Sequence, residues 1–175
     1  MRYIVSTIAI FSYLLASQYS ITGSKVVYYG DHALHKWEGS TNSAVGTLIY
    51  DTYNKTYSCT VTIPLNTFSS GNDNRDSNML YYCNAIEYPD IVFKSDMINV
   101  NKQSIDIEGI IEFAGEKRKL KTVAKLIKLN QNEFSIKGEF QIYLSNFNIA
   151  RPSLLFIKME DNILIEYSMM GVVNE

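Results

Sequence analysis

The stretch Val61–Ser95 limits the choice of fold most, because it is the part of the chain that combines strand patterns with a helix pattern. From Tyr57 to Ile63, apolar residues alternate with polar ones, a period of two that is typical of a strand with one apolar face. Pro64 cannot donate a backbone hydrogen bond, so we expect it to end this strand. A polar, turn-forming segment, Ser69–Asn74, follows.

A short helix is predicted next, over residues 75–84. Met79, Leu80 and Cys83 recur at spacings of three and four, which is the period of one helical face. Pro89 disfavours helical geometry in the residue before it, so we expect the helix to end earlier. The rest of the chain reads as alternating strands and turns. The sequence therefore predicts one helix inserted in an otherwise all-β chain.

The composition fits a single domain with a substantial core. Of the 175 residues, 46% are hydrophobic and 13% are aromatic, so disorder is not expected. Strand patterns separated by turns, with only three prolines and nine glycines, favour a barrel or a sandwich over a βαβ fold. The formal net charge of −2 offers no electrostatic footprint for nucleic acid, so nucleic acid is not an expected partner.

The order of several motifs resembles the YceI-like family, from about Trp37 to Val172. The matching segments are Ser70-Gly71-Asn72, Asn74-Arg75-Asp76, Met79-Leu80, Tyr88-Pro89-Asp90-Ile91, Phe93-Lys94-Ser95, Ile107-Glu108-Gly109, Phe134–Gly138 and Leu144–Ile149. The resemblance implies one antiparallel, lipocalin-like barrel of about eight strands. It also implies an apolar lumen that holds a long isoprenoid or another amphiphilic lipid. The segment after Ile149 departs from the family pattern, at a place where a lid or ligand end could differ.

The apolar side of each alternating strand is expected to face that lumen. The residues predicted to bind the ligand are Ile49, Val61, Ile63, Phe93, Ile107, Ile111, Phe113, Phe140, Ile142, Ile163 and Ile165. We therefore predict a non-enzymatic carrier of an isoprenoid or similar lipid. The same alternation is typical of a filled core, so a structural or interaction protein stays an alternative. Transient contact with a membrane and a homodimer are also left open.

Residues 1–20 are predicted to be a secretory signal peptide. Met1-Arg2-Tyr3 is a short basic start, and the apolar run Ile4–Ala16 is followed by small residues. The run is too short for an ordinary membrane span. An uncleaved anchor and a buried first strand are the alternatives. A cleaved signal would place the barrel domain, residues 24–173, in the periplasm or outside the cell.

The two cysteines, Cys59 and Cys83, each fall on an apolar face. Export makes a disulfide between them chemically feasible. Two buried thiols are the favoured alternative, and the spacing is not that of a redox or zinc motif.

No motif for catalysis, a cofactor or a metal is recognisable. His32 and His35 would suit a metal on a helix, but their segment reads as turn plus strand. We therefore expect their rings to diverge or to face opposite sides, and we predict no metal site. If the chain were an enzyme, Asp76 and these histidines would be its candidate groups. Trp37 is expected to pack in the core or at a barrel end, and contact with a ligand is the alternative.

The remaining charged groups are expected to be structural. Arg75 should pair with Asp76 or a neighbour, and the two could hold the loop that covers one barrel end. The basic cluster at Lys117–Lys125 is read as the solvated face of a strand. Glu108 and Glu112 on the preceding strand would lie across from these lysines. Gly109 is expected to let neighbouring strands approach closely.

Overall fold

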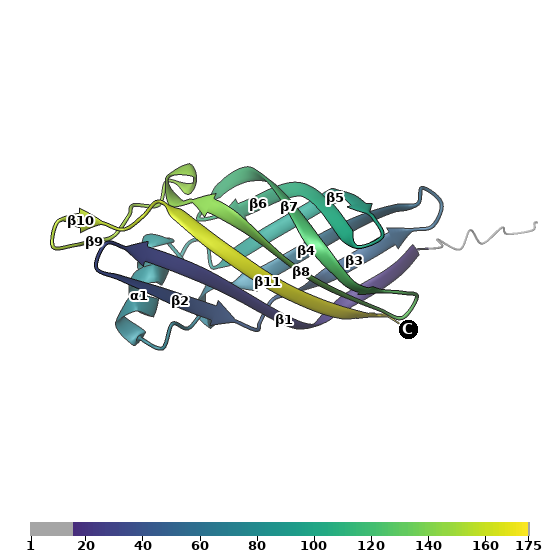
Figure 1. The fold of residues 1–175 in the computed structure, drawn as a ribbon, viewed down its shortest axis with the longest axis horizontal. Helices are drawn as coiled ribbons and strands as arrows, with labels where there is room; N and C mark the ends of the chain where they lie inside the picture. Colours follow the sequence, from purple (N-terminus) through teal and green to yellow (C-terminus); the bar gives the residue numbers. More distant parts are fainter. Residues whose placement is uncertain (1–15, 175) are drawn as a thin grey trace, which may run out of the picture.

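Eight long strands form a closed antiparallel barrel in the computed structural model, which describes residues 16–174 (Figure 1). They are β1 (Ala16–His32), β3 (Val45–Asp51), β4 (Thr56–Pro64), β5 (Asp90–Val100), β6 (Ser104–Phe113), β7 (Glu116–Leu129), β8 (Glu133–Tyr143) and β11 (Asn162–Val173). The last strand pairs with the first, from Tyr19 opposite Val173 to Tyr29 opposite Leu164. The predicted all-β barrel with one short helix is confirmed.

Several short elements gather at one end of the barrel (Figure 1). They are β2 (His35–Thr41), the 3₁₀ helices η1 (Leu65–Thr67) and η2 (Leu144–Phe147), the helix α1 (Asp73–Tyr82), and the hairpin of β9 (Ser153–Leu154) and β10 (Ile157–Lys158). Strand β2 pairs with the second half of β1, whose first half pairs with β3. A backbone bridge between Ser40 and Ser69 joins β2 to the loop before α1. None of the helices within residues 16–174 has the length and apolarity needed to cross a membrane.

Local sequence explains where α1 begins. The side chain of Asn72 accepts a hydrogen bond from the backbone N–H of Arg75 at 3.1 Å, which satisfies one of the free donors of the first turn. The carboxylate of Asp76 accepts hydrogen bonds from the backbone N–H and the hydroxyl of Ser70, the shorter at 2.6 Å. Asp76 thus holds the loop before α1, as predicted.

Close approach of strands explains Gly109. A β-carbon added there would lie 2.3 Å from the carbonyl oxygen of Lys94 and 2.6 Å from the Phe93 ring. The pairing of β5 with β6 shifts between Lys94 and Met97, opposite this residue. The strand therefore needs a glycine where the partner strand bulges inward, which agrees with the prediction.

The basic cluster on β7 is the solvated strand face that the sequence predicts. Lys121 and Glu108 are directly opposite in the sheet and form an ion pair at 2.6 Å, and Lys117 pairs with Glu112 at 3.4 Å. Exposed pairs of this kind contribute roughly 0–1 kcal/mol each. Two lysines of the cluster are thus paired with acids on the neighbouring strand.

The first strand begins earlier than the predicted domain boundary. Residues 16–20 belong to β1 and pair with β3, whereas the predicted signal peptide extends to residue 20. Tyr19 is buried, donates its hydroxyl to the carbonyl of Asn130 at 2.9 Å and sets its ring edge-on to Phe134. The part of the predicted signal before residue 16 lies outside the described residues.

We predict that a chain beginning at Ile21 is less stable than one beginning at Ala16 by about 4 kcal/mol, or does not fold. The shorter chain loses the Tyr19 side chain and the β1–β3 pairing. Thermal unfolding of the two purified chains measures the difference. Equal melting temperatures would show that residues 16–20 are dispensable.

Candidate ligand-binding site

The middle of the barrel encloses an apolar inner chamber of about 150 Å³. Its wall comes from every long strand of the barrel, and the surface that it presents is apolar. Val61, Ile107 and Phe140 are among the lining residues, and the Tyr167 ring lies tilted beside that of Phe140, with ring centroids 6.0 Å apart. Because no polar atom faces this space, it suits a hydrocarbon chain and no charged group.

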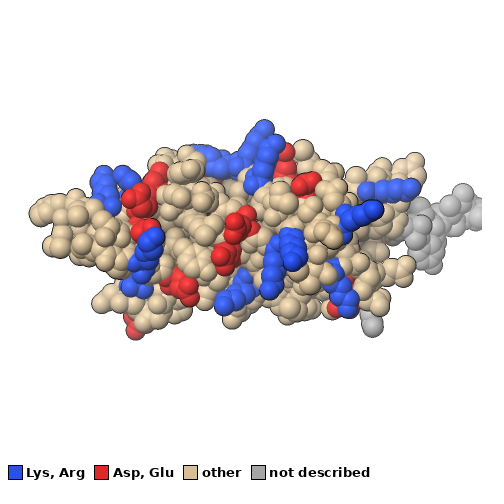
Figure 2. Space-filling view, viewed as in Figure 1, with Lys and Arg blue, Asp and Glu red and all other residues tan. Residues whose placement is uncertain are grey.

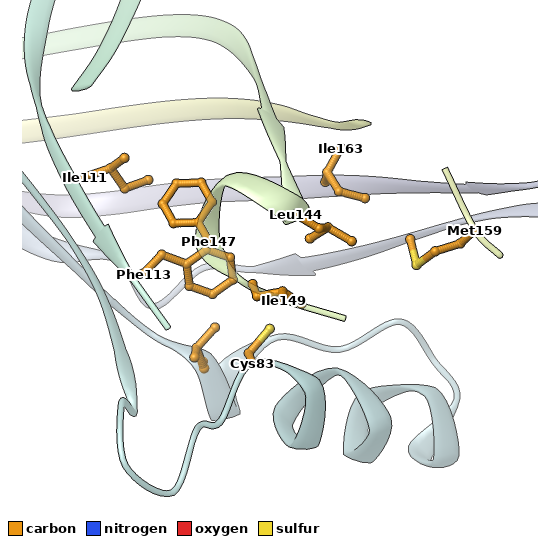
Figure 3. Close-up of a cluster of buried hydrophobic side chains, with 9 residues drawn as sticks. Cys83, Ile111, Phe113, Leu144, Phe147, Ile149, Met159 and Ile163 are labelled. Carbon is orange, nitrogen blue, oxygen red and sulfur yellow. The ribbon is translucent and has the colours of Figure 1, made fainter. Parts of the chain in front are cut away.

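A second, outer chamber of about 350 Å³ lies toward the end that α1 covers. Figure 3 shows part of its wall, where Cys83 points from the end of α1 toward Phe113 and Ile149. Polar groups join this wall, namely the side chains of Arg75, Asn78, His32 and His35. The outer chamber can thus hold a polar group that the inner chamber cannot.

The two chambers share part of their walls. The residues common to both are Phe68, Ile91, Phe113, Ile142 and Ile165. Together the chambers offer about 500 Å³, within the roughly 300–1,000 Å³ typical of small-molecule sites. The inner chamber alone falls below that range. The inner chamber is therefore best suited to extend the outer one. A ligand that used both would lie with its apolar chain in the inner chamber.

Ten of the eleven residues predicted to face the lumen line one or both chambers. That they bind a ligand stays a prediction. The exception is Ile49, which lies in a shallow groove outside the barrel with Ser58 and Lys94. Residues directly opposite in a sheet share a face, and Ile49 is opposite Ser58 while Leu48 is opposite Cys59. Leu48, not Ile49, therefore lines the lumen.

The histidines contradict the prediction that their rings diverge. His32 and His35 are directly opposite across the β1–β2 hairpin, and their ring centroids are 5.8 Å apart. His32 is buried and accepts a hydrogen bond at Nδ1 from the backbone N–H of Leu34 at 3.2 Å. Its Nε2 therefore carries the proton and donates to the carbonyl of Ile157 at 2.9 Å. Within residues 16–174, no group of three or more metal-binding side chains comes together.

Arg75 and Trp37 meet at the edge of the outer chamber. The Arg75 guanidinium carbon lies 5.5 Å from the Trp37 ring centroid, a cation–π arrangement. Of the partners predicted for Arg75, which were Asp76 or a neighbour, the Asp76 carboxylate is hydrogen-bonded to Ser70. Trp37 packs at the barrel end as predicted and also lines the chamber. A positive charge at this edge favours a ligand with an electron-rich polar end.

Tyr28 lines the outer chamber and is shielded from water there. Burial raises the pKa of its hydroxyl to about 12, and the nearby Asp76 carboxylate acts in the same direction. Its ring contacts Phe68 with centroids 5.8 Å apart. Tyr28 stays protonated at physiological pH and so presents a neutral hydroxyl.

The two cysteines are free thiols, the alternative that the sequence favours over a disulfide. Cys59 lines the inner chamber and Cys83 lines the outer one. Burial raises the pKa of Cys59 to about 11 and that of Cys83 to about 12 from the ordinary value of 9.0. Both thiols are therefore protonated and unreactive at neutral pH.

We predict that neither thiol reacts with a thiol reagent at pH 8 in the native protein, while both react in denaturant. Raising the pKa from 9 to 11 lowers the thiolate fraction at pH 8 about 100-fold. The cysteine thiols of the folded protein also keep their protons above pH 9, where those of the unfolded chain lose theirs. The contribution of the thiols to the free energy of unfolding is therefore complete below pH 9 and is lost as the pH rises toward 11 to 12. Rapid native labelling would contradict this burial.

The polar edge of the outer chamber could not be assembled from the sequence. Arg75 and the two histidines lie on segments about 40 residues apart, and no local pattern joins them. The one signal available was that His32, His35 and Trp37 lie within six residues of each other. Their hairpin brings them to one side because His32 and His35 are paired across it.

Comparison with known proteins agrees with this architecture. The YceI-like domain matches residues 18–170. The chain belongs to the YceI-like family. No curated protein gives a significant match. Family membership is consistent with a barrel built around an apolar lumen, which is the arrangement described above.

Solved structures of the family share this fold. BcnA from Burkholderia cenocepacia is 17% identical with a TM-score of 0.73, covering 84% of this chain and 95% of its own. A polyisoprenoid-binding domain from Saccharophagus degradans, implicated in plant cell wall breakdown, is 12% identical with a TM-score of 0.74, covering 89% and 98%. The YceI protein of Campylobacter jejuni is 17% identical with a TM-score of 0.65, covering 78% and 85%.

Proposed function

We propose that this protein is a carrier of an isoprenoid or similar amphiphilic lipid. The observation that carries the proposal is the pair of neighbouring chambers with a shared wall, the inner one apolar and the outer one edged by Arg75, Asn78 and two histidines. A long apolar chain would occupy the inner chamber, and a polar end would stay near Arg75. The Saccharophagus degradans neighbour, described as a polyisoprenoid-binding domain, supports this ligand class.

The chambers also bear on the alternative of a filled core. A structural protein with a solid barrel would leave neither the inner chamber of about 150 Å³ nor the outer chamber of about 350 Å³ beside it. We propose binding without catalysis, since the Asp76 carboxylate is hydrogen-bonded to Ser70 and the His32 ring to two backbone groups.

A role outside the cytoplasm, periplasmic or secreted, is part of the proposal. A homodimer stays a prediction, which light scattering of the purified protein tests.

Mass spectrometry of the organic extract of natively purified protein tests the carrier proposal. We expect one dominant isoprenoid or similar lipid at about one molecule per chain. An empty extract would be followed by titration with octaprenol in competition with a dye that brightens in apolar cavities. Failure to displace the dye would overturn the proposal.

A further inference from the structure

The hairpin of β9 and β10 exposes a continuous apolar tip. Leu154 to Ile157 are four apolar residues in a row, with Leu155 71% exposed and Phe156 fully exposed at 103%. Ile157 pairs with Leu154 and Lys158 pairs with Ser153. Other exposed large apolar residues in the described barrel strands are not consecutive in sequence, whereas here four follow one another. Such a run on a protein surface indicates a contact with an apolar partner.

The backbone conformation at the tip does not favour the side chains that are found there. Leu155 and Phe156 have φ values of 51° and 66°. Two-residue hairpins with positive φ at both central positions strongly favour Asn-Gly, because large side chains are strained there. The sequence instead places two large apolar residues where they cost stability and bury nothing. Their benefit must come from something outside the chain.

The base of the hairpin is fixed to the barrel. The buried His32 ring donates to the carbonyl of Ile157 at 2.9 Å. Below it, the backbone N–H of Glu160 donates to the carbonyl of Asp31 at 2.8 Å, and that of Met159 donates to the carbonyl of Pro152 at 2.9 Å. The tip is thus presented in a set direction.

The hairpin stands at the mouth of the outer chamber. Pro152, Ser153 and Leu154 are part of that chamber's wall. In Figure 1, β9 and β10 project past the other strands at the same end as α1. Figure 2 shows this end as a tip free of charged side chains on the visible face, with charged side chains beginning at its base. An apolar surface that met the tip would also meet the chamber.

The two charged residues that flank the apolar run, Arg151 and Lys158, are both positive and both exposed. The acids Glu160 and Asp161 follow at the base of the hairpin, so the cations are the charges nearest the tip in sequence. An apolar centre between cations matches the interface of a bilayer, where apolar side chains enter the acyl boundary and cations meet anionic headgroups. We therefore take a bilayer, and not a protein, as the partner. A protein partner would need an apolar pocket shaped to Leu155 and Phe156, whereas a bilayer needs only apolar side chains beside cations.

We propose that the β9–β10 hairpin docks the barrel on the surface of a bilayer that contains anionic lipid, with Leu155 and Phe156 inserted. Docked in this way, the outer chamber opens beside the membrane, and an isoprenoid could pass between them without crossing water. This exchange rests on the proposed carrier function, whereas the docking itself does not.

The test uses flotation with vesicles of phosphatidylcholine alone and with one third phosphatidylglycerol. The informative variant is Leu155→Asn with Phe156→Gly, which installs the preferred turn sequence, so the hairpin is kept and strain is relieved. We expect vesicle binding to fall about tenfold or more, because both inserted side chains are lost. Thermal stability should stay equal or rise, and octaprenol binding in detergent should be unchanged. Arg151→Gln with Lys158→Gln should weaken binding to the anionic vesicles only.

The outcomes separate the two proposals. Equal vesicle binding by the Asn-Gly variant and the parent chain would overturn docking through the tip, as would absence of binding by the parent chain. A concentration-dependent dimer that the variant abolishes would assign the tip to a second copy and also overturn docking. Loss of vesicle binding with octaprenol binding retained supports docking. Failure of octaprenol binding in both chains would overturn the carrier proposal and leave the docking result intact.

Discussion

Gly46→Ala should lower the free energy of unfolding by about 4 kcal/mol or more, or prevent folding. An added β-carbon would lie 2.1 Å from the carbonyl oxygen of Thr60 and 2.9 Å from the α-carbon of Val61. Both atoms belong to the backbone of β4, directly opposite β3, and cannot rotate away. The strands would have to separate where the barrel wall is continuous. Urea unfolding followed by circular dichroism measures the loss.

Gly71→Ala is the matched control for this prediction. Gly71 has a φ of 71°, but an added β-carbon there has nothing within 4 Å. We expect a loss of about 1 kcal/mol from the left-handed backbone alone. Similar losses at the two positions would show that the contact between β3 and β4 is looser than the structure indicates.

Ile165→Trp should weaken octaprenol binding about 100-fold and geraniol binding much less. Ile165 belongs to the wall that the two chambers share, so a larger side chain would fill the space between them. A short ligand needs only the outer chamber. A long one loses several buried methylene groups, each contributing about 0.8 kcal/mol. Displacement of a cavity-sensitive dye measures both affinities.

Met170→Trp provides the control for added bulk on the same strand. Met170 lies on β11 and is exposed, so the larger side chain points away from the chambers. Both ligands should bind this variant as they bind the parent chain. Equal loss of octaprenol and geraniol in Ile165→Trp would indicate a damaged barrel. Unchanged binding of both would show that ligands do not use the inner chamber.

Regular alternation made most of the barrel predictable. In β6, Ile105, Ile107, Ile111 and Phe113 face inward as their period of two requires. In β3, Leu48-Ile49-Tyr50 is continuously apolar, so alternation does not show which of these residues faces the lumen. Only the pairing of Leu48 with Cys59 shows that Leu48 does. The choice of Ile49 failed for that reason.

The polar edge of the outer chamber and the β9–β10 hairpin could not be predicted from local sequence patterns. The orientation of His32 and His35 depends on a two-residue turn between their strands, which the sequence pattern placed only as turn plus strand. Arg75 lies over the Trp37 ring, a contact between segments 38 residues apart that no local pattern indicates. The hairpin after Ile149 lies where the chain departs from the family pattern, so neither periodicity nor resemblance described it.

The pairing of β11 with β1 has a kinetic consequence. These strands lie at opposite ends of the chain, and they share a ladder from Tyr19 opposite Val173 to Tyr29 opposite Leu164. Contacts between such distant segments slow folding, because a long loop must close before they form. During synthesis the barrel cannot close until β11 has left the ribosome, because β11 supplies the strand that pairs with β1. The strands made earlier therefore stay in an open barrel until then, a state that chaperones can engage.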